Sequence, residues 1–239
     1  MTEPQEFFKP RVVRRTATKG GGAGLGLSLR PGDWLRMISD YFGIGRGRKR
    51  LEPITSLAGL SGFLDTRASF VAQTSLYGYL RTRAGMRYPE LFDDDPFVEG
   101  INVAKWHIWL DCLGDLSIHA GGLLCKGGGS HEAVRSLIEG LVGEILARTG
   151  TPQDAGGAWP EHAQRLRERV AAVDLARFED GEWAFTDSPA SVVRWSPVLD
   201  QLKELDEEIV LNSVRFRWQE VRRDLRACLD VQALLQPLN

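Results

Sequence analysis

The feature that most constrains the fold is the stretch from Phe97 to Leu124, which is apolar around nearly its whole circumference. A helix that lies on a protein surface keeps a polar side, so an apolar circumference predicts a helix buried at the centre of a bundle. Asp93-Asp94-Asp95-Pro96 predicts where this helix begins, because Asp caps a helix and Pro suits its first turn. Three glycines after Lys126 predict where it ends.

Four ionisable residues occur at every fourth position of this apolar helix: His107, Asp111, Asp115 and His119. Burying such groups is costly unless they are paired or bind a ligand. Three interpretations follow: a structural network in which neighbours in the series pair along the helix, a metal or acid–base site, and a solvent-facing groove that binds a partner. The four residues are therefore the candidate catalytic residues and weak candidates for metal ligands.

No recognised metal-binding motif accompanies this series. Neither the Glu-x-x-His pairing of di-iron helical bundles nor a His-Glu-x-x-His zinc motif is present. We therefore predict no cofactor. A second polar series, Asp65, Ser69, Gln73 and Tyr77, would meet the first one if the two helices packed antiparallel.

The other segments with helical periodicity predict an all-α fold of about five or six helices. They span residues 57–83, 130–148, 160–178 and 197–235, and residues 182–186 predict a short strand. Residues 149–159 contain Gly and Pro and form a candidate internal boundary.

Charge divides the chain into two parts. Residues 1–50 contain eleven Lys or Arg and four Asp or Glu, whereas the remainder contains nineteen basic and twenty-eight acidic residues. The glycine-rich residues 20–26 also make ordering of the backbone costly. We therefore predict a flexible basic arm over residues 1–52, with a short amphipathic helix at 34–42, and a helical domain over residues 53–239.

Partner contacts are expected in two places. In the arm, aromatic and basic residues suit an anionic membrane surface or another macromolecule; they are Trp34, Arg36, Arg46, Arg48, Lys49 and Arg50. In the helical domain, Trp159, Trp183 and Trp195 lie in or beside predicted loops, where we expect them to be exposed.

Four residues near the end of the predicted central helix match only part of a known catalytic pattern. His119-Ala-Gly-Gly resembles the oxyanion-hole segment of the lipases and esterases of the α/β-hydrolase family. That family also needs a Gly-x-Ser-x-Gly nucleophile turn between a strand and a helix, and neither Ser61 nor Ser130 lies in one.

The sequence favours a non-catalytic interaction, assembly or accessory subunit that docks through its basic arm onto a protein complex or an anionic membrane surface. The alternatives are an enzyme that uses the His/Asp series, and, third, a protein whose arm binds nucleic acid. Three widely spaced cysteines, no secretory signal and no long uninterrupted apolar run favour a cytoplasmic location, including the inner face of a membrane as a peripheral protein. The oligomeric state is not predicted.

Overall fold

Helices make up nearly all regular structure in residues 52–236, the part of the chain that the computed structural model describes. Within that part there is no β-strand, and five helices have 14 residues or more. The predicted all-α bundle is therefore confirmed. The predicted helix at 34–42 and all the partner residues proposed for the arm lie outside the described residues.

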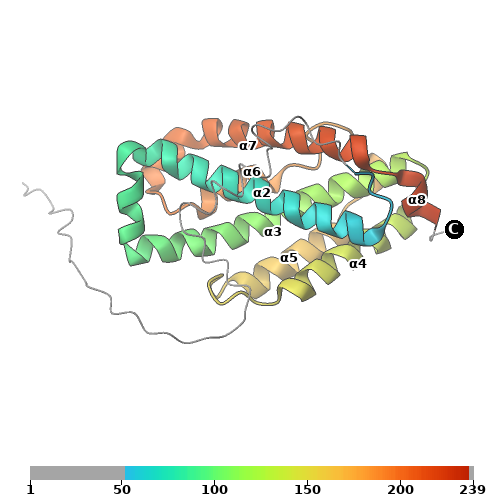
Figure 1. Ribbon diagram of the computed structural model, residues 1–239, viewed down its shortest axis with the longest axis horizontal. Helices are drawn as coiled ribbons and strands as arrows, with labels where there is room; N and C mark the ends of the chain where they lie inside the picture. The colour runs from blue at the N-terminus through green and yellow to red at the C-terminus, as the bar shows by residue number, and fades with distance from the viewer. Residues whose placement is uncertain (1–51, 237–239) are drawn as a thin grey trace, which may run out of the picture. The chain divides into compact units, whose positions relative to one another are not determined.

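Two long antiparallel helices, α2 (Leu57–Ala84) and α3 (Asp95–Lys126), form the frame of the bundle (Figure 1). The Ser56 hydroxyl accepts a hydrogen bond from the Gly59 backbone N–H at 3.2 Å and so caps the start of α2. Gly85 ends α2 with a φ of +55°, a conformation that side chains disfavour, and a 3-10 helix (Gly85–Asp93) leads to α3. α2 begins where the helical pattern predicted it, and α3 begins at the Asp/Pro signal.

The predicted burial of α3 is confirmed, because it packs against five other helices. They are α2, α4 (His131–Thr149), α5 (Trp159–Ala172), α6 (Asp187–Trp195) and α8 (Val231–Leu235). Every residue from Cys112 to Gly122 is buried. Gly122 permits the closest approach, since a Cβ added there would lie 2.0 Å from the ring of Phe178. The apolar circumference of α3 therefore reflects neighbours on all sides.

By length and mean hydropathy alone, α3 is also the one described helix that could cross a membrane. Other helices bury 83% of the apolar window that passes this test, and the core helix of a water-exposed bundle passes it as well. The feature is weak support for a membrane span. The sequence reading missed it because the His and Asp residues interrupt every long apolar run.

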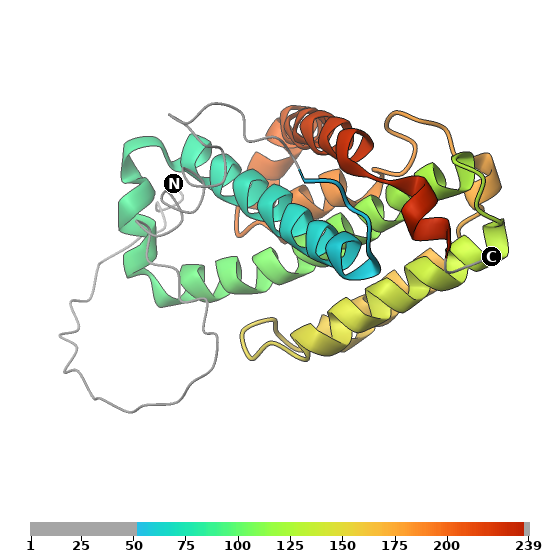
Figure 2. The ribbon, with the colours of Figure 1, turned by 45° about the vertical axis from the view of Figure 1, so that its right-hand side comes forward.

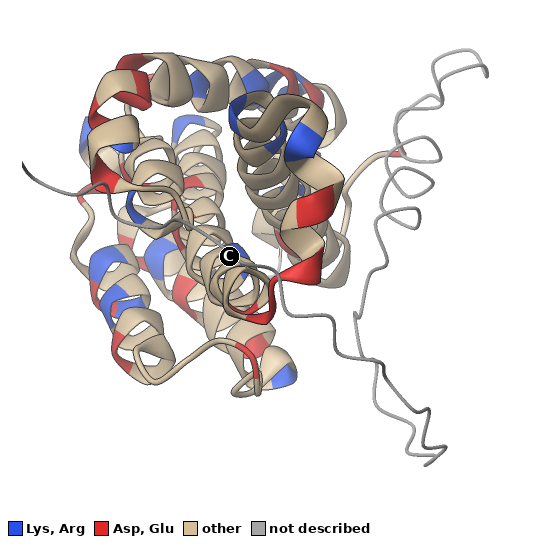
Figure 3. Ribbon diagram, turned by 90° about the vertical axis from the view of Figure 1, so that its left-hand side faces the viewer, with Lys and Arg blue, Asp and Glu red and all other residues tan. Residues whose placement is uncertain are grey.

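The second half of the bundle begins with α4 (His131–Thr149) and α5 (Trp159–Ala172), which lie side by side in Figures 1 and 2. The Gly/Pro segment at 150–158 connects them, and both belong to one compact unit spanning Leu51–Asn239. Charged residues of both signs are spread over the outside of these and the other helices (Figure 3).

Two secondary-structure predictions for residues 160–186 are wrong. The helix predicted over 160–178 ends at Ala172, and a 3-10 turn follows at Leu175–Arg177. Residues 182–186 form a turn, in which the Phe185 N–H donates to the Glu182 carbonyl at 2.9 Å. A strand needs a neighbouring strand for its backbone hydrogen bonds, and the described chain offers none.

An unpredicted helix, α6 (Asp187–Trp195), follows that turn. Its first residues, Asp187-Ser188-Pro189, repeat the Asp-then-Pro signal that correctly marked the start of α3. This signal was not used in the prediction because the helix that it begins is only nine residues long and ends before Ser196.

The helix predicted over 197–235 is interrupted near its end, giving α7 (Asp200–Cys228) and α8 (Val231–Leu235). At the break the Ile54 N–H donates to the Cys228 carbonyl at 2.7 Å, and the Asp230 N–H donates to the Ile54 carbonyl at 3.1 Å. Residues near the start of the domain thus take hydrogen bonds that would otherwise continue the helix. This interruption depends on a contact that the local sequence does not reveal.

Candidate functional site

The four residues of the His/Asp series lie on the side of α3 that faces α5, α6 and the loops beside them. His107, Asp115 and His119 have no exposed surface, and Asp111 is partly exposed. Each member has different surroundings because successive fourth positions rotate about 40° around a helix. Pairing along α3 is therefore wrong as an expectation: the partners come from other elements.

Two histidines and an aspartate form the first part of this polar layer. His107 Nδ1 lies 2.6 Å from Nδ1 of His162 on α5, and His162 Nε2 lies 2.8 Å from Asp111 Oδ1. On its other side, His107 Nε2 lies 3.1 Å from the carbonyl oxygen of Ala155. A single hydrogen-bonded chain thus runs from the loop before α5 to the Asp111 carboxylate.

The surroundings of His107 favour its neutral form. Burial, and then the charge of His162, lower the pKa of His107 from its ordinary 6.5 to about 4. The indole ring of Trp195 stacks on the imidazole with ring centres 3.7 Å apart. His107 is therefore a buried, neutral link whose ring orientation is fixed by an aromatic neighbour.

His162 is the functional residue that the sequence reading missed. It lies 55 residues after His107 and 51 after Asp111. Nothing in the linear spacing relates it to the series on α3. Its only visible peculiarity is an imidazole in the first turn of an otherwise charged helix, three residues after Trp159.

Asp115 forms the second part of the layer. Its Oδ1 accepts from Arg169 Nη2 at 2.7 Å, and its Oδ2 accepts from the backbone N–H of Ser188 at 2.8 Å. The Asp187 N–H is also 3.4 Å from Oδ1. Because these amides belong to the first turn of α6, a carboxylate of α3 caps α6 from outside that helix.

Burial raises the pKa of the Asp115 carboxyl to about 6, and the Arg169 charge and the Ser188 hydrogen bonds oppose that rise. Arg169 in turn donates to the Ala184 carbonyl and lies 3.2 Å from Asp187. The polar atoms at this point are well satisfied by the chain itself. Asp115 therefore has a sufficient structural role in holding α6 against α3.

His119 has no such partners. Within the described residues neither ring nitrogen has a hydrogen bond, and the rings of Phe178 and Phe185 lie 5.4 and 5.1 Å away. Burial lowers the pKa of His119 to about 4, so the ring is neutral at pH 7. It packs as an aromatic core residue.

Asp65, the first residue of the polar series on α2, does not join this layer. Asp65 pairs with Arg148 of α4 at 3.0 Å. The hydrogen-bonding partners of the α3 series come instead from α5, α6 and the Ala155 loop. The two helices are antiparallel as supposed, but Asp65 faces α4 rather than the series on α3.

A cleft of about 410 Å³ opens beside Asp111 and His162. It is lined mainly by charged and polar residues of α3, α5, α6 and the turn before α6, namely Asp111, His162, Arg165, Leu166, Glu168, Arg169, Thr186, Asp187, Ala190 and Arg194. In the described part of the chain, no three His, Cys, Asp or Glu side chains converge as a metal site would require. The arrangement therefore suits hydrogen bonding and proton exchange better than metal coordination.

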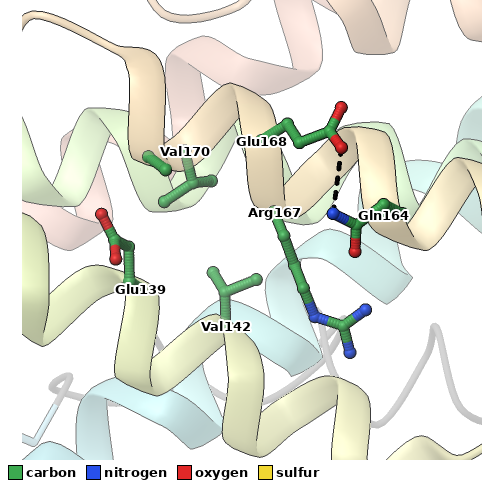
Figure 4. Close-up of a pocket in the computed structure, with 7 residues that line it drawn as sticks. Glu139, Val142, Gln164, Arg167, Glu168 and Val170 are labelled. Atoms are coloured by element: carbon green, nitrogen blue, oxygen red, sulfur yellow. Dashed lines mark hydrogen bonds between the residues drawn. The ribbon is translucent and has the colours of Figure 1, made fainter.

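A second hollow, of about 320 Å³, lies between α4 and α5 and is shown in Figure 4. Glu139 and Val142 approach it from α4, while Gln164 and Arg167 approach it from α5. The Gln164 amide donates to Glu168 at 2.9 Å. Its lining consists mostly of exposed side chains, and it contains no buried titratable group.

The three tryptophans proposed for partner contact are less available than expected. Trp159 is buried and stacks with Trp109, which corrects its predicted exposure. Trp195 is half-buried over His107, and Trp183 is half-buried with its ring edge-on to Phe178. Trp159 begins α5, Trp195 ends α6 and Trp183 lies in a turn, and all three rings pack against the core because large aromatic side chains gain most by burial.

The exposed apolar residues gather instead on α7. Leu205, Ile209 and Phe216 are 72–74% exposed and, by helical geometry, lie within about 40° of one another around the axis. We call these three residues the α7 stripe. The buried side of α7 consists of Val210, Val214, Trp218, Val221, Leu225 and Cys228.

Two exposed acidic residues, Glu204 and Glu208, lie on one flank of the α7 stripe, and a third, Glu207, lies on the opposite side of the helix. Glu204, Glu207 and Glu208 are exposed, and no ion pair joins them to the described part of the chain. By contrast, Asp200 pairs with Lys203, and Asp206 pairs with Arg83. The sequence-based prediction did not include this surface, because it was based only on the buried residues and the arginines of the same helix.

The comparisons with known proteins identify no relative. No family model, curated protein or solved structure matches this chain. Any function must therefore be inferred from the residues themselves.

Proposed function

We propose that this chain is a non-catalytic interaction or assembly subunit that binds a basic amphipathic helix of a partner protein through the α7 stripe. The observation that carries the proposal is the exposure of Leu205, Ile209 and Phe216 on one side of a helix whose other side is buried from Val210 to Cys228. Single exposed apolar residues are ordinary, but grouped ones are typical of contact surfaces.

The dimensions of the stripe fit a helix. From Leu205 to Phe216 the chain advances 11 residues, or about 16 Å along the axis. A partner helix of three turns presents apolar residues at i, i+3 and i+4 over a similar length. Phe216 is the expected anchor, because aromatic residues contribute strongly at such contacts.

The charge beside the stripe favours a basic partner. Glu204 and Glu208 have no basic partner among the described residues, and by helical geometry they lie on one flank of the Leu205 and Ile209 end of the stripe. Lysines or arginines on the partner would complement them, speeding association and excluding acidic surfaces.

The basic arm is the second part of the proposal. Its residues Trp34, Arg36, Arg46, Arg48, Lys49 and Arg50 supply a separate attachment to the same protein complex. An anionic membrane surface, with the chain peripheral to the inner face, is the alternative attachment, and nucleic acid is the third. In each case we expect the protein in the cytoplasm.

The test is site-specific photo-crosslinking in native cells that express the full chain. A photo-reactive residue at Ile209 is compared with one at Met86, an equally apolar but isolated residue that is 96% exposed. We expect the Ile209 probe alone to link to one partner segment with apolar residues at helical spacing and flanking lysines or arginines. Links to an acidic segment, to a second copy of the chain, or equally from both probes would overturn the proposal.

The arm is tested separately in the full chain. Replacing Arg46, Arg48, Lys49 and Arg50 by Glu is expected to weaken recovery of the same partner and to leave the Ile209 crosslink site unchanged. If the substitutions instead abolish pelleting with vesicles that contain phosphatidylserine, with partner recovery unaffected, the arm binds membranes rather than the complex.

A further inference from the structure

The hydrogen-bonded chain through His162 fixes a number of protons. The Ala155 carbonyl can only accept, so His107 Nε2 must carry a proton. One further proton must lie between the two Nδ1 atoms, and a third between His162 Nε2 and Asp111 Oδ1. Two neutral imidazoles and an ionised carboxylate carry only two protons on these atoms. The three hydrogen bonds therefore require one additional proton.

Differences in burial indicate that the extra proton is shared by Asp111 and His162, the two residues nearest the cleft. His107 is fully buried, whereas the Asp111 and His162 side chains are 13% and 5% exposed at the cleft. A neutral His107 leaves the third proton shared by Asp111 and His162, which together are then uncharged overall. The carboxylate of Asp111 is thereby held in a fixed orientation at the cleft wall.

One oxygen of this carboxylate is free. Oδ1 is occupied by His162, and Oδ2 has no hydrogen-bond partner in the described structure. A partly exposed carboxylate oxygen held by a rigid neighbour is a ready acceptor for a hydroxyl or ammonium group of a ligand. The other acidic residues of the cleft are already engaged, since Asp187 pairs with Arg169 and Glu168 accepts from Gln164.

The same cleft contains an unpaired cation. Arg194 of α6 is exposed, and its guanidinium has no ion pair with any described residue. Arg169 is committed to Asp115 and Asp187, and Arg165 lies 2.6 Å from Glu161. Arg194 is therefore the group in this cleft that is available for a carboxylate.

We propose that the cleft between α5 and α6 binds a small hydroxy or amino carboxylate, whose acid group pairs with Arg194 and whose hydroxyl or ammonium donates to Asp111 Oδ2. The volume of about 410 Å³ falls within the range of small-molecule sites. This site is separate from the α7 stripe and does not depend on the proposed partner contact.

Binding is measured by calorimetry on the full chain with L-malate, L-lactate and L-serine as probes. Acetate and ethanolamine serve as one-group controls, since each carries only half of the required chemistry. We expect at least one of the three probes to bind at least tenfold more tightly than either control, because two charge-assisted contacts replace one.

Two variants locate the binding. Arg194→Ala changes an exposed residue and should weaken binding at least tenfold, whereas Arg81→Ala, at an exposed arginine on α2, should not change it. Asp111→Asn should weaken binding as well, with folding checked by circular dichroism. Should the Asn variant not fold, Arg194→Ala alone decides. Absence of binding by all three probes, or binding unaffected by Arg194→Ala, would overturn the proposal.

Discussion

Asp115 on α3 and Phe216 on α7 both lie in surroundings opposite to those their chemistry favours. Asp115 is a carboxylate with no exposed surface, and Phe216 is an aromatic ring that is 72% exposed. Around Asp115 the chain supplies an arginine and two backbone amides. Around Phe216 the described chain supplies no cover. A buried charge whose partners come from the same chain indicates a structural role. An exposed apolar side chain that the chain does not cover indicates a surface for contact with another molecule.

Removing Asp115 should give the largest change. Asp115→Ala is expected to lower the free energy of unfolding by about 3–5 kcal/mol, because it removes the buried partner of Arg169 and leaves the first amides of α6 without an acceptor. Urea unfolding at pH 7 measures this. The matched control is Glu90→Ala, which removes an exposed ion pair with Arg87 and should cost less than about 1 kcal/mol. Equal effects would mean that the buried layer adds no stability.

Acid should weaken the fold through His119. The unfolded chain binds a proton at this residue near pH 6.5, whereas the folded chain does so only at about 4. Stability is therefore fully present above pH 6.5 and is lost as the pH falls towards 4, by about 3 kcal/mol from this residue.

His119→Leu should remove this part of the acid sensitivity and change stability at pH 7 by no more than about 1 kcal/mol, since two apolar rings surround the site. Unfolding free energies of both proteins at pH 7 and pH 4.5 give the comparison. A pH dependence identical to that of the unaltered chain would show that His119 is not held neutral.

Two glycines distinguish a packed surface from an open one. Gly122→Ala places a methyl group against the Phe178 ring and should destabilise the chain by about 1–3 kcal/mol. Gly62→Ala on α2 meets no atom within 4 Å and should stabilise it by about 0.5–1 kcal/mol. Thermal unfolding of the two variants is expected to shift in opposite directions, and a shift in the same direction contradicts the packing described around α3.

Changes to the α7 stripe should have the smallest effect on stability. Ile209→Asp and Phe216→Asp are expected to change the free energy of unfolding by less than about 0.5 kcal/mol, because both side chains are already exposed. They should nevertheless abolish recovery of the partner. A large loss of stability would instead show that this side of α7 is covered by the chain itself.

The sequence predicted helix boundaries well wherever a local signal specifies them. Ser130 and Pro96 mark starts that the structure reproduces, because capping and proline geometry involve only neighbouring residues. The same logic would have found α6 from Asp187 and Pro189. The interruption at Leu229 was not predictable in this way, since Ile54 supplies its hydrogen bonds from the other end of the domain.

The candidate site was only half visible in the sequence. The spacing of His107, Asp111, Asp115 and His119 correctly indicated one side of a buried helix, but not what lies opposite each residue. His162 and Arg169 reach that side from more than 50 positions along the chain. Asp111 and His119 consequently have different roles although the sequence presents them as equivalent.

By itself, the sequence determined that α3 is a central helix with its ionisable residues on one side, since periodicity and capping are local properties of the chain. Only the tertiary structure decided that Asp115 holds α6, that His119 has no polar partner, and that the unpaired apolar surface belongs to α7. The physical reason is that helical periodicity sets the direction of a side chain, whereas the paths of the connecting loops decide which atoms it meets.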